Sequence, residues 1–100
     1  MTTVHNIRFE SYDIYIGRAG HGQSGEFGNP FREASHAASV AKFKQYFYDR
    51  LTKDQQFKLS VLKLRDKRLG CFCKPHKPCH GDVIAEYLNN LPLLRYAVVG

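Results

Sequence analysis

The chain has 100 residues, with 15 basic and 9 acidic side chains that give a formal net charge of +6, and 43% of its residues are hydrophobic. This length suits a single domain over residues 1–100, and the composition is typical of a globular protein rather than a disordered tail. No apolar run approaches the roughly 20 residues that cross a bilayer, and the first ten residues lack the apolar stretch of a signal peptide. We therefore expect a cytoplasmic protein with no membrane partner, and the basic excess favours anionic partners.

Hydrophobic patterns predict short strands and amphipathic helices along the chain. In chain order we expect strands over residues 4–9 and 13–17, followed by a loop over 17–31. Two helices come next, one from Ser35 to about Leu51 and one from about Thr52 or Asp54 to about Leu64. We then expect a strand over 69–73, a third helix over about 80–89 and an optional edge strand over 96–99. This order predicts a small α/β (or α+β) domain, with one sheet of about three to four strands covered by about three helices.

The buried faces of the helices follow from apolar side chains that recur at spacings of three and four. The residues expected in the core are Val40, Phe43, Phe47 and Leu51 in the first helix, Phe57, Val61 and Leu64 in the second, and Val83, Ile84, Tyr87 and Leu88 in the third. Ser35 is a favourable N-cap for the first of these helices.

The segment 71–82 contains the residues best suited to chemistry. Cys79 and His80 lie where a loop enters a helix, and there the unpaired backbone N–H groups and the helix dipole favour a thiolate or a bound anion. We assign His80 as the candidate acid or base and Cys79 as the candidate nucleophile or ligand. Asp82 is the candidate that orients His80 or binds a sugar hydroxyl, and the backbone around Gly81 offers donors to a phosphate or carboxylate.

Two other interpretations of this segment stay open. Three clustered cysteines do not resemble a secreted disulfide scaffold, and zinc ligands can be drawn from Cys71, Cys73, Cys79 and His80, with His76 as a further choice. The spacing differs from that of the usual zinc knuckles, so zinc is a possible cofactor that we do not favour, and the cofactor is otherwise unknown. Alternatively, Cys71 and Cys73 pack in the core and Asp82 only complements the helix dipole.

The glycine-rich loop is the second candidate region. Gly17 and Gly28 let the backbone approach a ligand closely, and Arg18 can hold a phosphate or carboxylate with its planar guanidinium. Asn29, followed by Pro30, can contact a base edge or a ribose hydroxyl, or form an Asx-turn that holds the loop. Neither the Walker pattern nor a G-x-G-x-x-G motif opening a helix is present, and a plain surface loop is the alternative.

The motifs Gly28-Asn29-Pro30 and Cys79-His80-Gly81 occur together in a known group of proteins. With the flanking residues they resemble the domain of unknown function 4326 family, short phage and bacterial proteins marked by a GNP and a CHG motif. The resemblance extends over about residues 13–89. It implies a small α/β fold and, for a phage gene, the cytoplasm of the bacterial host, but no established reaction.

The leading functional hypothesis is a site for a nucleotide- or nucleoside-like anionic small molecule, formed by the GNP loop and the CHG helix N-terminus, with catalysis as an extension of that hypothesis. The alternative is a phage interaction protein without enzymatic activity that binds host nucleic acid or a host protein. A zinc-stabilised module is the third hypothesis. None of the three assigns an oligomeric state.

Overall fold

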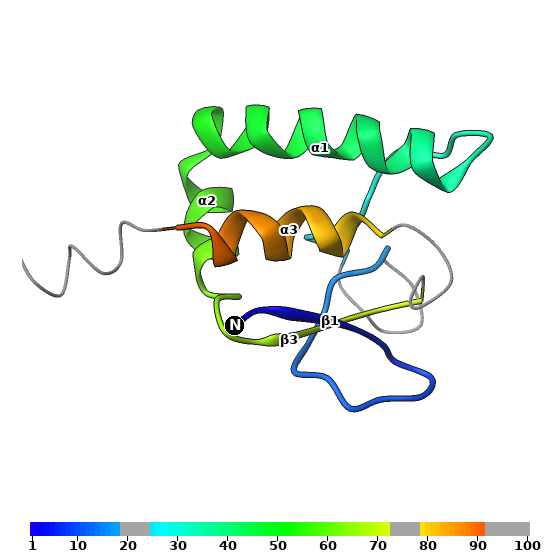
Figure 1. Ribbon diagram of the computed structural model, residues 1–100. Coiled ribbons are helices and arrows are strands. Elements are labelled where there is room, and N and C mark those ends of the chain that lie inside the picture. The colour runs from blue at the N-terminus through cyan, green and yellow to red at the C-terminus, as the bar shows by residue number, and fades with distance from the viewer. Residues whose placement is uncertain (19–24, 73–78, 92–100) are drawn as a thin grey trace, which may run out of the picture.

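The computed structural model describes residues 1–18, 25–72 and 79–91, and Figure 1 shows their arrangement. The elements are β1 (Thr3–Asn6), β2 (Ile14–Tyr15), α1 (His36–Lys53), α2 (Gln55–Leu62), β3 (Arg68–Cys71) and α3 (His80–Asn89). Three strands and three helices make a small α/β fold, as the sequence predicts.

The described strands form one parallel sheet in the order β1-β3-β2. Leu69 of β3 is paired with Val4 of β1 on one side and with Ile14 of β2 on the other. The connection from β1 to β2 crosses one face of this sheet, where Ile7 and Tyr12 lie against Gly70. Among the described strands, the one that comes last in the sequence is therefore the central one.

On the other face of the sheet, α3 lies next to the strands, and α1 packs on α3 and α2 (Figure 1). α1 and α3 both begin at the end of the molecule where β1 and β3 finish, so two helix N-termini lie near the carboxyl ends of parallel strands. Large fully buried side chains fill the space between these layers: Ile16, Phe43, Phe47, Val61, Leu64, Leu69, Ile84 and Leu88. None of the described helices is long and apolar enough to cross a membrane.

The predicted helices agree closely with the structure, because their caps are encoded locally. Ser35 accepts a hydrogen bond from Ala38 N at 3.1 Å and begins α1, and Asp54 accepts one from Phe57 N at 3.1 Å and begins α2. Val40 and Tyr87 are only partly buried at the edge of the core.

The predicted strands were too long. The first strand ends at Asn6 and not at residue 9, because the carbonyl of Asn6 accepts hydrogen bonds from Phe9 N and Glu10 N and its side chain accepts one from Arg8 N, which turns the chain. β2 covers two residues within the predicted 13–17, and β3 ends at Cys71. Cys73 and the strand expected over 96–99 lie outside the described residues.

An Asp13→Asn variant should lose stability mainly above about pH 4. Asp13 accepts hydrogen bonds from the guanidinium and the backbone N–H of Arg68, and these bonds lower the pKa of its carboxyl from 3.8 to about 2. The stabilisation is therefore present above about pH 4 and is lost as the pH falls toward 2. Denaturant unfolding across this range should show a stability difference between wild type and variant that narrows at low pH. A constant difference would contradict the prediction, and Asp49→Asn, whose carboxylate pairs with the exposed Lys53, is the matched control.

Candidate functional site

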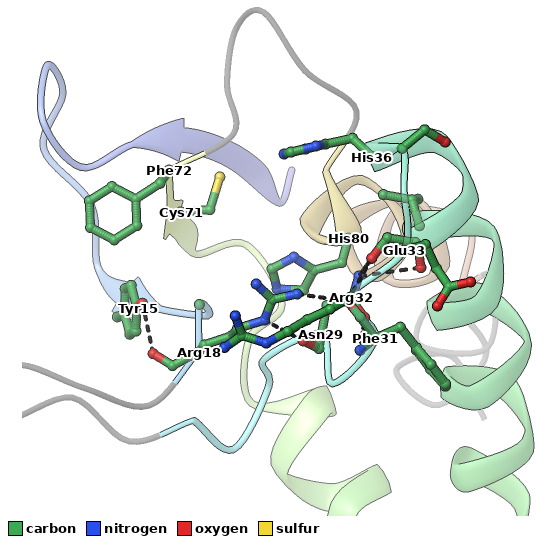
Figure 2. A pocket seen from close by; sticks show the side chains of 14 residues that line it. Tyr15, Arg18, Asn29, Phe31, Arg32, Glu33, His36, Cys71, Phe72 and His80 are labelled. Atoms are coloured by element: carbon green, nitrogen blue, oxygen red, sulfur yellow. Dashed lines mark hydrogen bonds between the residues drawn. The ribbon is translucent and has the colours of Figure 1, made fainter.

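A cavity of about 470 Å³ opens at the carboxyl ends of β2 and β3, beside the first turn of α1. Its lining residues are Tyr15, Gly17, Arg18, Asn29, Phe31, Arg32, Glu33, Ser35, His36, Ser39, Val40, Cys71, Phe72 and His80. Figure 2 shows Tyr15 and Phe72 on one side, residues from the start of α1 on the other, and His80 between them. Segments from both candidate regions thus line one cavity.

His80 is held rigidly at the inner wall of this cavity. Its Nε2 lies 2.6 Å from the carbonyl oxygen of Ile16, so Nε2 carries a proton and donates it, because a carbonyl can only accept. Phe43 packs against the imidazole at a centroid distance of 5.1 Å, and the residue is 6% exposed. Burial lowers the pKa of His80 below its ordinary value of 6.5, against the opposing effect of the hydrogen bond to Ile16. At neutral pH the ring is therefore uncharged, with its lone pair on Nδ1.

The GNP loop lies against the end of β2 because Gly28 has no side chain. A Cβ at Gly28 would lie 2.8 Å from the carbonyl oxygen of Gly17, closer than real Cβ atoms come to other atoms, and 3.0 Å from Arg18 Cα. Asn29 then fixes the loop: its Oδ1 accepts from Phe31 N at 2.9 Å, and its Nδ2 donates to Ser39 Oγ at 2.9 Å. These bonds make Asn29 the Asx-turn residue of the loop and tie the loop to α1.

Arg18 is immobilised by the same loop. Its Nε donates to the carbonyl oxygen of Asn29 at 2.9 Å, and its Nη2 donates to that of Phe31 at 2.7 Å. Arginine has five N–H donors, so the outer edge of the guanidinium can still reach a ligand. A guanidinium held in place in advance loses little conformational entropy when it binds an anion.

The electrostatics of the cavity favour negative charge. Arg18 and Arg32 both line it, and Arg32 forms no ion pair or hydrogen bond with the described residues. The one carboxylate among the described lining residues, Glu33, is paired with Lys42 Nζ at 2.9 Å. The first turn of α1 holds no acidic residue, so its N-terminal dipole adds to the positive potential.

The two described cysteines meet behind this wall. Cys79 Sγ lies 3.2 Å from Cys71 Sγ, and it accepts a hydrogen bond from Gly81 N at 3.4 Å as the N-cap of α3. Cys79 is fully buried and does not line the cavity, whereas Cys71 does. His80 Nδ1 lies 3.9 Å from Cys79 Sγ, which makes the two thiols and the imidazole one contiguous group.

The described residues contain no group of three or more histidine, cysteine or acidic side chains that could hold a metal ion. Two of the zinc candidates, Cys73 and His76, lie outside the described residues. The zinc hypothesis built on Cys71, Cys73, Cys79 and His80 therefore stays a prediction.

The rest of the CHG motif explains how α3 meets the sheet. A Cβ at Gly81 would lie 2.7 Å from Ile16 Cδ1 and 3.0 Å from Val4 Cγ1, so glycine allows the helix to begin directly against β1 and the end of β2. Asp82 lies in the first turn of α3, where a negative charge complements the helix dipole, and its N–H donates to the carbonyl oxygen of Cys79 at 3.0 Å.

Comparison with known proteins places the chain in a family. The model of the family described as domain of unknown function 4326 matches residues 2–90. The chain belongs to this family. An uncharacterized 12.4 kDa protein in the nrdA-td intergenic region of Enterobacteria phage T4 is 46% identical over 57 residues, which are 57% of this chain and 52% of that protein. The chain thus aligns with about half the length of this family relative. No solved structure matches it.

The motifs that define this resemblance divide into two sets. Of the residues singled out from the sequence, Gly17, Arg18, Asn29, Cys71 and His80 line the cavity, whereas Gly28, Pro30, Cys79, Gly81 and Asp82 do not. Of the motif residues outside the cavity, Gly28 and Gly81 allow the segments around it to pack closely, and Cys79 caps α3.

Several lining residues had not been singled out as ligand-binding, above all Arg32, His36 and Phe72. A signal for Arg32 and His36 did exist in the sequence, because both lie between the GNP motif and the first turn of the next helix. Phe72 stands where the family resemblance usually has an aromatic residue, but an aromatic residue after a strand is equally typical of the core.

Replacing Gly28 by alanine should open the loop and destabilise the protein by about 1–3 kcal/mol, since the new Cβ would overlap backbone atoms that cannot rotate away. Denaturant unfolding measures this loss. An unchanged stability of Gly28→Ala would show that the loop is not held in this way.

His80→Gln should destabilise the protein at pH 7.5 by about 1–3 kcal/mol through loss of the hydrogen bond to Ile16 and of ring packing. Because the pKa of His80 is lowered in the folded state, the unfolded chain takes up the proton first, and wild-type stability falls as the pH drops below about 6.5. The variant lacks this pH dependence, so the difference in the free energy of unfolding between wild type and variant should narrow as the pH falls from about 7.5 to 5. The same narrowing in His36→Gln, an exposed histidine, would contradict the assignment.

Proposed function

We propose that the chain binds a small anionic molecule of nucleotide or nucleoside type in the cavity between the GNP loop and the N-terminus of α3. The observation that carries this proposal is the presence of Arg18 and Arg32 in one cavity whose described carboxylate, Glu33, is already neutralised by Lys42. Two guanidinium groups without a matching acid repel each other, and a phosphate or carboxylate relieves that repulsion.

The position and size of the cavity support a small molecule. Ligands of parallel α/β sheets bind beyond the carboxyl ends of the strands, which is where this cavity lies. A volume of about 470 Å³ falls within the range of small-molecule sites. A concave site with fixed donors favours such a ligand over the rival proposal of a host nucleic acid or protein, which would contact a broader surface.

Catalysis at this site is the extension of the proposal, and His80 is its candidate acid–base group. Its Nε2–H is committed to Ile16, so a proton would be transferred at Nδ1, which is basic because the ring is neutral at pH 7. Cys71 is the described thiol that lines the cavity, and it replaces Cys79 as the better-placed candidate nucleophile.

The first test is a thermal-shift screen of wild type against inorganic phosphate, nucleotides, nucleosides, NAD, ADP-ribose and phosphosugars. A ligand at a hundred times its dissociation constant stabilises the folded state by about 2.7 kcal/mol, which raises the midpoint measurably. Arg32→Ala should lower the affinity for any ligand found in the screen about tenfold or more, because a charged hydrogen bond is lost. Arg65→Ala, which removes an equal charge from the turn before β3, should not. The proposal would be overturned if no ligand in the panel raised the melting temperature, or if both variants lost the same affinity.

A further inference from the structure

The ring of Phe72 is an apolar surface that the described part of the fold covers only in part. Phe72 follows β3 directly and is 50% exposed, whereas its neighbour Cys71 is buried in the core. Its ring lies at the cavity with Tyr15, at a centroid distance of 6.2 Å and an interplanar angle of 71°. A large aromatic ring gains free energy by burial, so an exposed one at a cavity is a natural contact for a ligand.

Nearby side chains fix these two rings. The Tyr15 hydroxyl donates to the carbonyl oxygen of Arg18 at 2.8 Å, and burial raises its pKa, which keeps it a donor. The guanidinium of Arg8 lies over the Phe72 ring, with Cζ 5.3 Å from the centroid. Tyr15 and Phe72 therefore form an ordered aromatic wall, held by the backbone of Arg18 and the side chain of Arg8.

The opposite wall has a different chemistry. Figure 2 shows Arg32, Glu33 and His36 across the cavity from Tyr15 and Phe72. With Glu33 paired to Lys42, that wall offers positive charge and the N-terminus of α1. A cavity with an aromatic wall and a cationic wall matches a ligand that has a planar ring at one end and an anion at the other.

We propose that the ligand is a nucleoside monophosphate bound in one orientation, with its base against Phe72 and Tyr15 and its phosphate toward Arg32 and the first turn of α1. This inference rests on the proposed function and narrows it, because it excludes phosphosugars, which lack the ring, and free nucleosides, which lack the phosphate. Base–aromatic stacking tolerates any base, so the wall selects for a ring without selecting its identity.

The test measures dissociation constants by calorimetry for three kinds of ligand: the four ribonucleoside 5′-monophosphates, the matching nucleosides, and ribose 5-phosphate. The proteins are wild type, Phe72→Ala, Phe72→Tyr and Arg32→Ala. Phe9→Ala is the matched control, since Phe9 is 78% exposed and lies outside the cavity lining. Circular dichroism checks that each variant is folded.

We expect Phe72→Ala to weaken the binding of the monophosphates about tenfold and to leave the binding of ribose 5-phosphate unchanged. Phe72→Tyr should bind nucleotides as wild type does. Arg32→Ala should weaken both phosphorylated ligands to the same extent. An equal loss for ribose 5-phosphate and nucleotides in Phe72→Ala, or no loss at all, would overturn the orientation while leaving an anion site intact.

Two further outcomes separate this inference from the broader proposal. If wild type binds neither nucleotides nor ribose 5-phosphate, the proposed function fails together with the inference. If a tetranucleotide binds far more tightly than any monophosphate, with an affinity that falls steeply with salt, the aromatic and cationic walls belong to a nucleic-acid site and the inference is wrong.

Discussion

The hydrogen bond from His80 Nε2 to the carbonyl oxygen of Ile16, at 2.6 Å, joins the two halves of this small domain. It links the first residue of α3 to the segment that leaves β2, 64 positions earlier in the chain. A buried, short bond to a backbone carbonyl is costly to break, because both groups would be left without a partner in a site that excludes most water. The inner wall of the cavity includes this contact, since Gly17 and Arg18 follow Ile16 directly and the GNP loop packs against their backbone.

The GNP and CHG motifs both allow close packing against the segment that follows β2. Gly28 lets the GNP loop approach the backbone of Gly17, and Gly81 lets α3 begin against Ile16 and Val4. Their polar neighbours then fix each approach, Asn29 through Ser39 and His80 through Ile16. The glycines of both motifs thus serve the packing, whereas Asn29 and His80 line the cavity together with adjacent positions such as Arg32 and Phe72.

Local signals explain which parts of this structure could be predicted. Ser35 and Asp54 cap helices through bonds within three residues, and apolar spacing defined the faces that carry Phe43 and Phe47. Strand ends were harder, because the turn at Asn6 depends on that side chain bonding to the chain just after it. Strand order was not predictable, since inserting β3 between its partners depends on distant pairings. The cavity was predictable only in part. The location of Arg18 and His80 followed from the motifs and their flanking residues, whereas the exposure of Phe72 is a property of the folded surface.

The central position of β3 also bears on how the protein is made. Among the described strands, β1 and β2 each pair with β3, which emerges from the ribosome after both of them and after α1 and α2. A nascent chain that stops before residue 68 can form its helices but has no partner for either edge strand. The CHG motif appears later still, so the cavity is completed only when α3 has been synthesised. A chain that ends before His80 would therefore lack the inner wall of the cavity.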